Sequence, residues 1–194
     1  MRQKDKSVYK IAMTGLLAAL SYVAFTFLQI KIMLPGGDAT SFHLGNTICV
    51  LGALLAGTVS GSLGGAIGMT IGDLLDPVYV IYAPKTFILK MLIGLIAGGI
   101  AHGIGHINQQ KDRGKILRLA VIASVCGLGF NVIADPLLGY VYKVLIIGQP
   151  AAQVALTWNF ITTGSNAVIS AVAAVILYMA LRPVFAKAGL LPES

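Results

Sequence analysis

The sequence predicts an all-α membrane protein, a six-transmembrane-helix bundle with both termini in the cytoplasm. Hydrophobic residues make up 57% of its 194 residues and charged residues only 11%, whereas a soluble domain has about 25% charged residues. The mean hydropathy is +0.85. Six apolar segments follow one another without a soluble domain boundary between them, so we expect residues 1–194 to form a single integral membrane domain.

The apolar segments differ in length and in the residues that interrupt them. The long ones reach the roughly 20 residues that a helix needs to cross a bilayer. The second and third are short and rich in glycine, and each is ambiguous when taken alone. Asp135-Pro136 interrupts the fifth segment, and a solvated loop over residues 108–118 precedes it. In order, the segments cover residues 11–30, 44–56, 62–75, 85–104, 119–142 and 158–181.

The distribution of basic residues orients the bundle. An even number of spans places both termini on one side, and that side collects most of the lysines and arginines. The other side holds Lys31, Lys85 and Lys143, with Lys90 just inside a helix. Because cytoplasmic loops carry the excess of Lys and Arg, we interpret the net charge of +7 as membrane orientation and expect no nucleic-acid partner. The basic residues assigned to the cytoplasm are Arg2, Lys4, Lys6, Lys10, Lys111, Arg113, Lys115, Arg118, Arg182 and Lys187.

The sequence lacks the motifs that would indicate several kinds of enzyme chemistry. No Gly-x-x-x-x-Gly-Lys-Ser/Thr motif is present, so the chain should not hydrolyse ATP itself. No Ser/His/Asp or His-Glu-x-x-His arrangement indicates catalysis, and we expect no enzyme, no catalytic residue and no metal site. Cys49 and Cys126 lie in apolar segments and are too few to indicate a disulfide framework.

Polar side chains gather at the outward ends of the segments. Asp73, Tyr79 and Lys85 lie in the connection between the third and fourth segments, and His43 opens the second. Because polar side chains at membrane depth normally face protein or a water-filled cavity, we interpret this concentration as the mouth of a binding site. The candidate substrate-binding residues are His43, Asn46, Tyr79, Lys85, Asn131, Trp158 and Asn159.

The sixth segment carries a polar stripe. Asn159, Thr163, Asn166 and Ser170 step by four, three and four residues, so they share one helical face. Trp158 caps the stripe and can stack on a flat ring. The stripe could instead form interhelical hydrogen bonds. We expect Asn159, nearest the mouth, to bind the ligand and Ser170 to be structural.

Four charged residues have alternative interpretations. An ionisable residue such as Asp135 inside a membrane segment indicates a functional site, yet Pro136 removes a backbone donor and could make this a helix break. Asp73 and Lys85 could form a charge pair at the membrane boundary. Lys90 could neutralise a carboxylate or phosphate of a ligand, or pair with Asp135.

Small residues mark one face of the first segment. Gly15 and Ala19 are four residues apart, as are Thr14 and Ala18, and such pairs let another helix approach closely in lipid. The approaching helix could belong to a partner or to the same bundle. Gly57, Gly61 and Gly65, and likewise Gly64, Gly68 and Gly72, have the same spacing, and we assign them to internal packing.

Four motifs together resemble the substrate-binding S components of energy-coupling factor (ECF) vitamin transporters. The resemblance covers essentially the whole chain and is closest over residues 42–99. It implies a six-helix subunit of the bacterial plasma membrane that captures a vitamin from outside. The motifs are Phe42-His43-Leu44-Gly45-Asn46, Leu54-Leu55-Ala56-Gly57, Gly72-Asp73-Leu74 and Ala83-Pro84-Lys85-Thr86-Phe87-Ile88-Leu89-Lys90.

The resemblance also implies partners. S components associate with a transmembrane scaffold (T) subunit and two ATPases, so the chain itself would carry no cofactor and ATP would be used by its partners. The docking face of the family matches Gly15, Ala18 and Ala19 here. Its pocket lies near the outer surface, between the loop after the first helix and the outer halves of helices four to six, where the polar residues of this chain also gather.

Alternatives remain open for the identity of the substrate and for the class of function. The turns look most like those of members assigned to pyridoxine, hydroxymethylpyrimidine or pantothenate, and less like those of the riboflavin and thiamin members. One alternative is a membrane enzyme acting on a lipid-linked substrate, with Asp73 and His43 as its only outward acid/base candidates. Another is a small channel or scaffold, which would need a continuous polar path, whereas the polar residues gather in the outer half.

Overall fold

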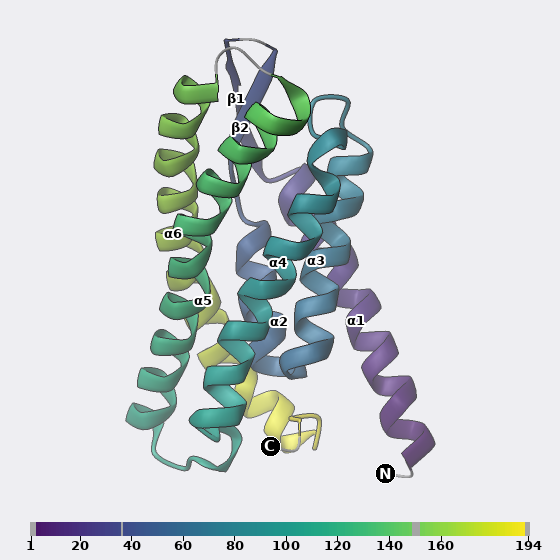
Figure 1. Ribbon diagram of the computed structural model, residues 1–194. Helices are drawn as coiled ribbons and strands as arrows, with labels where there is room; N and C mark the ends of the chain where they lie inside the picture. The colour runs from purple at the N-terminus through teal and green to yellow at the C-terminus, as the bar shows by residue number, and fades with distance from the viewer. Residues whose placement is uncertain (1–2, 36, 149–151, 193–194) are drawn as a thin grey trace.

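The computed structural model describes residues 3–35, 37–148 and 152–192, and Figure 1 shows its arrangement. Arg2 lies outside the described residues, as do the side chains of Lys4 and Lys6. The main elements are α1 (Gln3–Thr26), β1 (Gln29–Leu34), β2 (Asp38–His43), α2 (Gly45–Ala56), α3 (Thr58–Leu74), α4 (Ala83–Gly98), α5 (Arg113–Tyr142) and α6 (Ala152–Lys187). Short helical turns join them: η1 (Val80–Tyr82), η2 (Gly99–Ile104), η3 (Ile107–Gln109) and η4 (Lys143–Ile147).

The helices form a bundle with two distinct ends (Figure 1). The β1–β2 hairpin lies at one end, where the α3–α4 connection also lies. The start of α1, the α4–α5 connection and the end of the described chain lie at the other. Within the bundle α3 packs against α1, α2 and α4, and α6 packs against α5, α2 and the hairpin. We call these the hairpin end and the terminal end.

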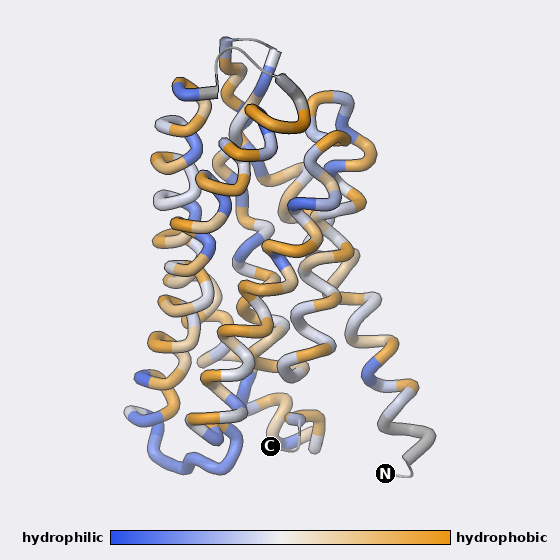
Figure 2. Tube along the Cα trace, viewed as in Figure 1, coloured by the Kyte–Doolittle hydropathy of each residue, from blue (hydrophilic) through white to orange (hydrophobic). Residues whose placement is uncertain are grey.

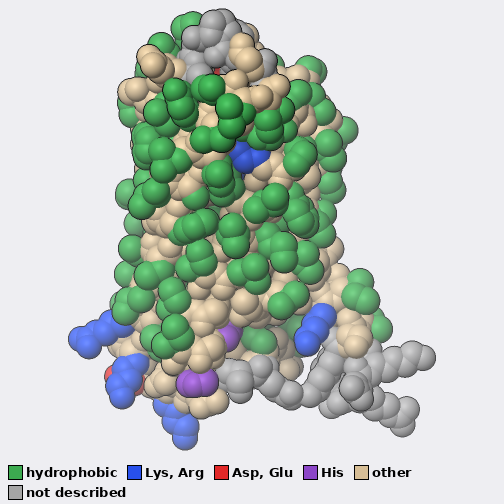
Figure 3. Space-filling view, viewed as in Figure 1, with side chains coloured by type: hydrophobic (Ala, Val, Ile, Leu, Met, Phe, Trp, Pro, Cys, Tyr) green, Lys and Arg blue, Asp and Glu red, His purple; other side chains and the backbone are tan. Residues whose placement is uncertain are grey.

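The surface suits a hydrocarbon environment. Many large apolar side chains of α1, α5 and α6 are exposed, among them Ile11, Val125 and Val172. Figures 2 and 3 show hydrophobic residues along the bundle, with basic side chains gathered at the terminal end. Among the described residues, four helical stretches are long and apolar enough to cross a membrane: Ser7–Thr26, Val80–Ile104, Arg113–Ile146 and Gln153–Lys187. The other two helices, α2 with 12 residues and α3 with 17, are shorter.

The helices fall close to the predicted segments, but several boundaries were wrong. The first helix ends at Thr26, because the residues predicted to complete it form β1. Half of the predicted loop over residues 108–118 is helical, since Asp112 caps α5 by accepting a hydrogen bond from the Gly114 N–H. The sixth helix is longer than predicted at both ends. Pro136 lies inside α5 without ending it.

Glycines bring the first three helices into backbone contact. A Cβ atom at Gly68 on α3 would overlap the carbonyl oxygen of Ala18 on α1, and one at Gly61 would overlap the backbone of Ala53 on α2. A Cβ atom at Gly65 would lie 2.5 Å from the sulfur of Cys49. Close approach of this kind replaces the missing hydrophobic driving force between helices in lipid. The predicted internal role of the glycine series is confirmed.

The two small-residue pairs on α1 point in different directions. Thr14 and Ala18 face α3, because the Thr14 hydroxyl approaches the Ser60 carbonyl oxygen at 3.4 Å and the Ala18 backbone lies against Gly68. Gly15 and Ala19 are exposed, and a Cβ atom at Gly15 would meet nothing within 4 Å. Only the second pair is free to receive another helix.

Gly68→Ala should destabilise the bundle, because α1 and α3 would have to move apart to admit a methyl group. Overpacking of this kind costs about 1–3 kcal/mol. Gly15→Ala is the matched control and should be neutral or stabilising by up to about 1 kcal/mol, the helix-propensity difference. Thermal unfolding of both variants in detergent measures this. Equal melting temperatures for the two variants would contradict the close α1–α3 contact.

Candidate functional site

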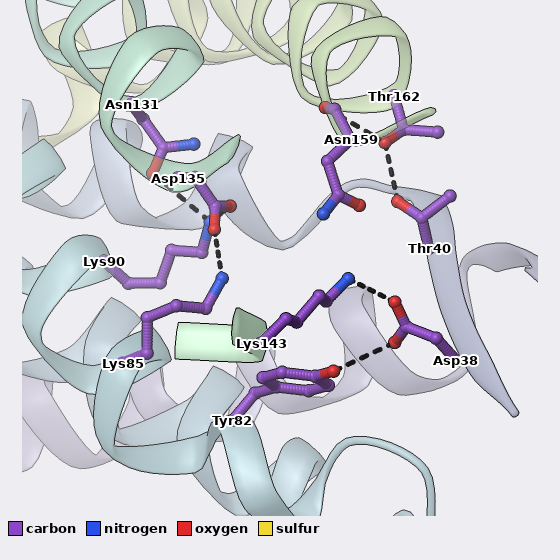
Figure 4. Close-up of polar contacts among 10 residues, drawn as sticks. All are labelled: Asp38, Thr40, Tyr82, Lys85, Lys90, Asn131, Asp135, Lys143, Asn159 and Thr162. Atoms are coloured by element: carbon purple, nitrogen blue, oxygen red, sulfur yellow. Dashed lines mark hydrogen bonds and ion pairs between the residues drawn. The ribbon is translucent and has the colours of Figure 1, made fainter. Parts of the chain in front are cut away.

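A cavity of about 90 Å³ lies at the hairpin end, enclosed by the hairpin, α3, α4, α5, η4 and α6. Its wall mixes aromatic rings, hydroxyls, amides and charged groups. The close-up in Figure 4 shows the polar side chains that converge on it. Its lining residues are Phe25, Ala39, Thr40, Ser41, His43, Met69, Asp73, Tyr79, Tyr82, Lys85, Thr86, Lys90, Asp135, Lys143, Asn159, Thr162, Thr163 and Asn166.

The hairpin closes one side of the cavity and is held to α6 by hydrogen bonds. The hydroxyls of Thr40 and Thr162 are 2.7 Å apart. The Asn166 amide donates to the Ser41 carbonyl at 2.9 Å and accepts from the His43 backbone N–H at 3.0 Å. Part of the predicted polar stripe on α6 therefore pairs with the hairpin.

A second attachment joins the hairpin to the α3–α4 connection. Lys31 on β1 donates to Asp76 at 2.5 Å and lies 4.4 Å from the ring centre of Tyr79. Partial burial alone would raise the pKa of the Asp76 carboxyl, but hydrogen bonds from Lys31 and from the Val78 N–H bring that pKa below its usual range. Asp76 therefore stays ionised at neutral pH, and the tie is an ion pair.

Two ion-pair clusters lie on the cavity wall (Figure 4). In the first, Lys85 and Lys90 of α4 both pair with Asp135 of α5; the Lys90 distance is 3.4 Å. Lys90 also donates to the Asn131 side-chain oxygen at 3.5 Å. In the second, Lys143 and the Tyr82 hydroxyl both donate to Asp38 of β2.

These pairs decide between the alternatives left open by the sequence. Asp135 is an ion-pairing residue within a continuous helix, so the helix-break interpretation was wrong. Lys90 does pair with Asp135. Lys85 also pairs with Asp135, and the suggested Asp73–Lys85 pair does not form. Burying such charges is costly unless they are paired, which explains why α4 and α5 meet at these positions.

Some buried polar atoms on the wall have no hydrogen-bond partner among the described residues. They include Nδ1 of His43 and the hydroxyl of Tyr79, and both side chains line the cavity. A buried polar group without a partner carries an uncompensated desolvation cost. A ligand with complementary polar groups would remove that cost, so these atoms point to a binding function.

The structure brings four of the seven predicted site residues to the wall: His43, Tyr79, Lys85 and Asn159. The other three do not line it. Asn131 is buried behind Lys90, and Asn46 is buried at the start of α2 with both amide atoms unpartnered. Trp158 lies one turn beyond Thr162 on α6 and is 38% exposed.

Sequence reasoning missed the hairpin contribution and η4. Ala39, Thr40 and Ser41 were not considered because residues 29–43 were not predicted as a hairpin. Lys143 was noted only as an outward charge, and nothing in the sequence indicated that its partner is Asp38, 105 positions away. Thr163 and Asn166 belonged to the predicted stripe, and they do line the cavity.

A bundle of apolar helices around a polar cavity closed by a hairpin is the architecture of a membrane protein that binds a small polar molecule. A family model described as "ECF-type riboflavin transporter, S component" matches residues 5–183. The chain belongs to this family, which confirms the expected S component. No curated protein and no solved structure matches the chain.

Membership of this family defines the class of the protein. It is a vitamin-specific transporter subunit and a multi-pass integral membrane protein, consistent with the bacterial plasma membrane. The family is a transporter class, not an enzyme class, and its members associate with T and ATPase modules. The narrower expectation of pyridoxine, hydroxymethylpyrimidine or pantothenate finds no support in this match, whose family name indicates riboflavin.

Proposed function

We propose that this chain is the substrate-specificity subunit of an ECF transporter, capturing a small water-soluble vitamin in the cavity at the hairpin end. The observation that carries the proposal is the polar cavity whose wall presents unpartnered buried atoms of His43 and Tyr79. Riboflavin is the first candidate, by the family name. Pyridoxine, hydroxymethylpyrimidine and pantothenate are the further candidates from the motif resemblance.

The proposed topology is a single integral membrane domain of six spans with both termini in the cytoplasm. The basic residues at the terminal end support it. The short helices α2 and α3 would complete the spans within the shelter of their neighbours, since 11 of the 12 residues of α2 are buried. The hairpin end would then face outward.

Cysteine labelling tests this orientation. A cysteine at Asp112, next to the basic loop of the terminal end, should react only with membrane-permeant reagents. A cysteine at Val80, 39% exposed at the hairpin end, should react with impermeant reagents added from outside. The reverse labelling pattern would contradict the topology.

A vitamin needs more room than the cavity offers. Sites for small molecules typically enclose roughly 300 Å³ or more, against about 90 Å³ here. The hairpin is the element to move, because its ties to α6 and to Asp76 are hydrogen bonds and a partly exposed ion pair. Water and ligand can replace such bonds at a small net cost. The buried Asp38–Lys143 pair would stay closed and limit the movement.

Within the cavity we assign ligand contacts to His43, Tyr79, Lys85 and Asn159. Asn159 faces the centre of the site in Figure 4, where its amide can both donate and accept a hydrogen bond. Asn131 accepts a hydrogen bond from Lys90 and does not itself line the cavity. Asn46 and Trp158 lie off the wall, so we assign them no direct contact.

Asn159→Ala should weaken vitamin binding by about tenfold or more, because a buried hydrogen bond lost from one side costs about 1–3 kcal/mol. Ser170→Ala is the matched control: it lies deeper on the same helix, is fully buried and does not line the cavity. Calorimetric titration with riboflavin, pyridoxine, hydroxymethylpyrimidine and pantothenate gives the comparison. Loss of binding in Ser170→Ala with retention in Asn159→Ala would move the site away from the cavity.

The proposed partners are a T subunit and two ATPases, which would use ATP while this chain holds no cofactor. The docking face is the side of α1 that carries Gly15 and Ala19, both exposed, with Ala18 at its edge against α3. Small side chains there leave room for a partner helix to approach closely. Membrane lipid covers the remaining apolar surface.

Enlarging both Gly15 and Ala19 to Leu should abolish vitamin uptake by the complete transporter while the isolated subunit still binds vitamin. The control is Gly129→Leu on α5, where a Cβ atom also meets nothing within 4 Å. Uptake assays in proteoliposomes and titration of the purified subunit separate the two effects. If uptake persisted in the double variant, or if binding fell with it, α1 would not be the docking face.

A further inference from the structure

The first turns of α1 lie beyond the contacts that pack the rest of this helix. The close contacts of α1 with the glycines of α2 and α3 run from Thr14 to Thr26. Before Thr14 about three turns of helix remain, and Val8 and Ile11 on them are exposed. Figure 1 shows this part of α1 extending away from the other helices. Because helix ends with few packing contacts open most readily, the position of this part depends on its further attachments.

The chain turns back toward α1 after the last helix. Gly189 follows α6 in the left-handed conformation, with a φ of +67°. The Leu190 N–H donates to the Phe185 carbonyl oxygen at 2.9 Å. The Gly189 N–H donates to the Ala186 carbonyl oxygen at 3.1 Å. These two bonds form a Schellman motif, which ends a helix and fixes the direction of the chain beyond it. Residues 188–192 therefore leave α6 in a defined direction.

The far end of this segment is attached to the bundle. The Asn108 side-chain amide of η3 donates to the Pro192 carbonyl oxygen at 2.9 Å. A Cβ atom at Gly57, in the turn between α2 and α3, would lie 3.3 Å from the Pro192 ring. Leu191 packs against the hydrophobic core. The segment is thus held at one end by α6 and at the other by the bundle.

The middle of the segment holds α1. The Tyr9 hydroxyl on α1 donates to the Leu190 carbonyl oxygen at 3.0 Å, although the two residues are 181 positions apart. Tyr9 precedes Thr14, so this bond reaches the part of α1 that lies beyond the glycine contacts. A segment anchored at both ends and bonded to α1 in its middle limits how far the start of α1 can swing.

We propose that residues 188–192 form a strap that fixes the start of α1 and thereby sets the angle at which α1 presents Gly15 and Ala19 to a partner helix. This inference rests on the proposed function, since it assumes that the T subunit docks on that face. A helix held in its docking orientation loses less conformational freedom on binding, so it binds more tightly. The strap lies at the terminal end, and it acts on docking without touching the vitamin cavity.

Two variants loosen the strap in different ways. Tyr9→Phe removes the hydroxyl that donates to Leu190 and keeps the aromatic ring. Gly189→Val disfavours the left-handed conformation on which the direction of the strap depends, because a β-branched residue rarely adopts a positive φ.

Each variant has a matched control. Tyr22→Phe makes the same change on the same helix within the glycine-packed part, where the Tyr22 ring packs edge-on against Phe27. Gly148→Val introduces the same backbone conflict at the hairpin end, since Gly148 has a φ of +68°.

Spin labels measure the position of α1 directly in the purified full chain. Labels at Ile11 on α1 and at Ile104 on η2, both exposed, report the distance between the start of α1 and the bundle in a Cys126→Ala background. We expect the distance distribution to broaden in both strap variants and to stay unchanged in both controls. An unchanged distribution in the two strap variants would overturn the strap.

Binding of the T subunit and its ATPases to this chain in lipid nanodiscs measures docking. Affinity should fall by about two- to tenfold in Tyr9→Phe, the effect of one hydrogen bond, and at least as far in Gly189→Val. The two controls should dock as the unmodified chain does. Titration of the isolated strap variants with the four candidate vitamins should match the unmodified chain, because the cavity lies at the hairpin end.

A cross-link separates the strap from a general loss of stability. A short bismaleimide between Tyr9→Cys and Leu190→Cys, again in the Cys126→Ala background, ties α1 to the strap without the hydroxyl. Docking should be weak before cross-linking and recover after it. If the cross-link instead blocks docking, the segment must be released for docking and the proposal is overturned.

The remaining outcomes separate the strap from the docking face. If the strap variants broaden the distance distribution and still dock as before, the strap does not set docking, and the proposed docking face stands. If the chain with Gly15 and Ala19 both enlarged to Leu docks normally, the docking face is wrong and the strap loses its proposed role with it.

Discussion

The hairpin end of this protein depends on the pairing of buried charges. A charged side chain inside a membrane protein is costly unless it faces a partner or a cavity. Here Asp135 of α5 holds two lysines of α4, and Asp38 of the hairpin holds Lys143 beyond α5. Each pair joins elements that are distant in sequence. The same contacts therefore place the hairpin, fix the approach of α4 to α5 and give the cavity its polar wall.

Packing in the rest of the bundle follows a different rule. From Gly61 to Gly72 the third helix replaces side-chain volume with close helix contact, and α1 and α2 lie directly against it. This contact uses one face of α1 for the bundle. The other face, with Gly15 and Ala19, stays open. Internal packing and an open face thus coexist on one helix because the two small-residue pairs are one residue out of phase.

The helices were predictable from sequence because apolar length and the bilayer constrain them strongly. The hairpin was not, although its signals are present: Gln29, Lys31 and Ile30, Ile32 alternate, and a Pro-Gly-Gly turn follows. They were missed because the start of β1 continues the apolar run of the first helix and was assigned to that helix. Four residues that line the cavity were predicted because they lie beside the helix ends where the polar residues of the sequence gather. Asp38 and Lys143 were not, since only the fold brings a strand residue and a turn residue 105 positions apart into contact.

Stability and binding act against each other at this site. The hydroxyls and amides that hold the hairpin to α6 include Thr162 and Asn166, which also line the cavity. If the proposed vitamin site is correct, the ligand displaces part of the hairpin and exchanges some of these bonds for its own. Because a typical hydrogen bond contributes only about 0.5–1.5 kcal/mol net, the exchange is affordable where the hairpin is tied by a few polar contacts. The buried ion pairs of Asp135 and of Asp38, the second of which lies in the hairpin itself, are far more costly to separate. The Lys85–Asp135–Lys90 cluster is therefore the fixed part of the site, and the hairpin can yield only as far as the buried Asp38–Lys143 pair allows.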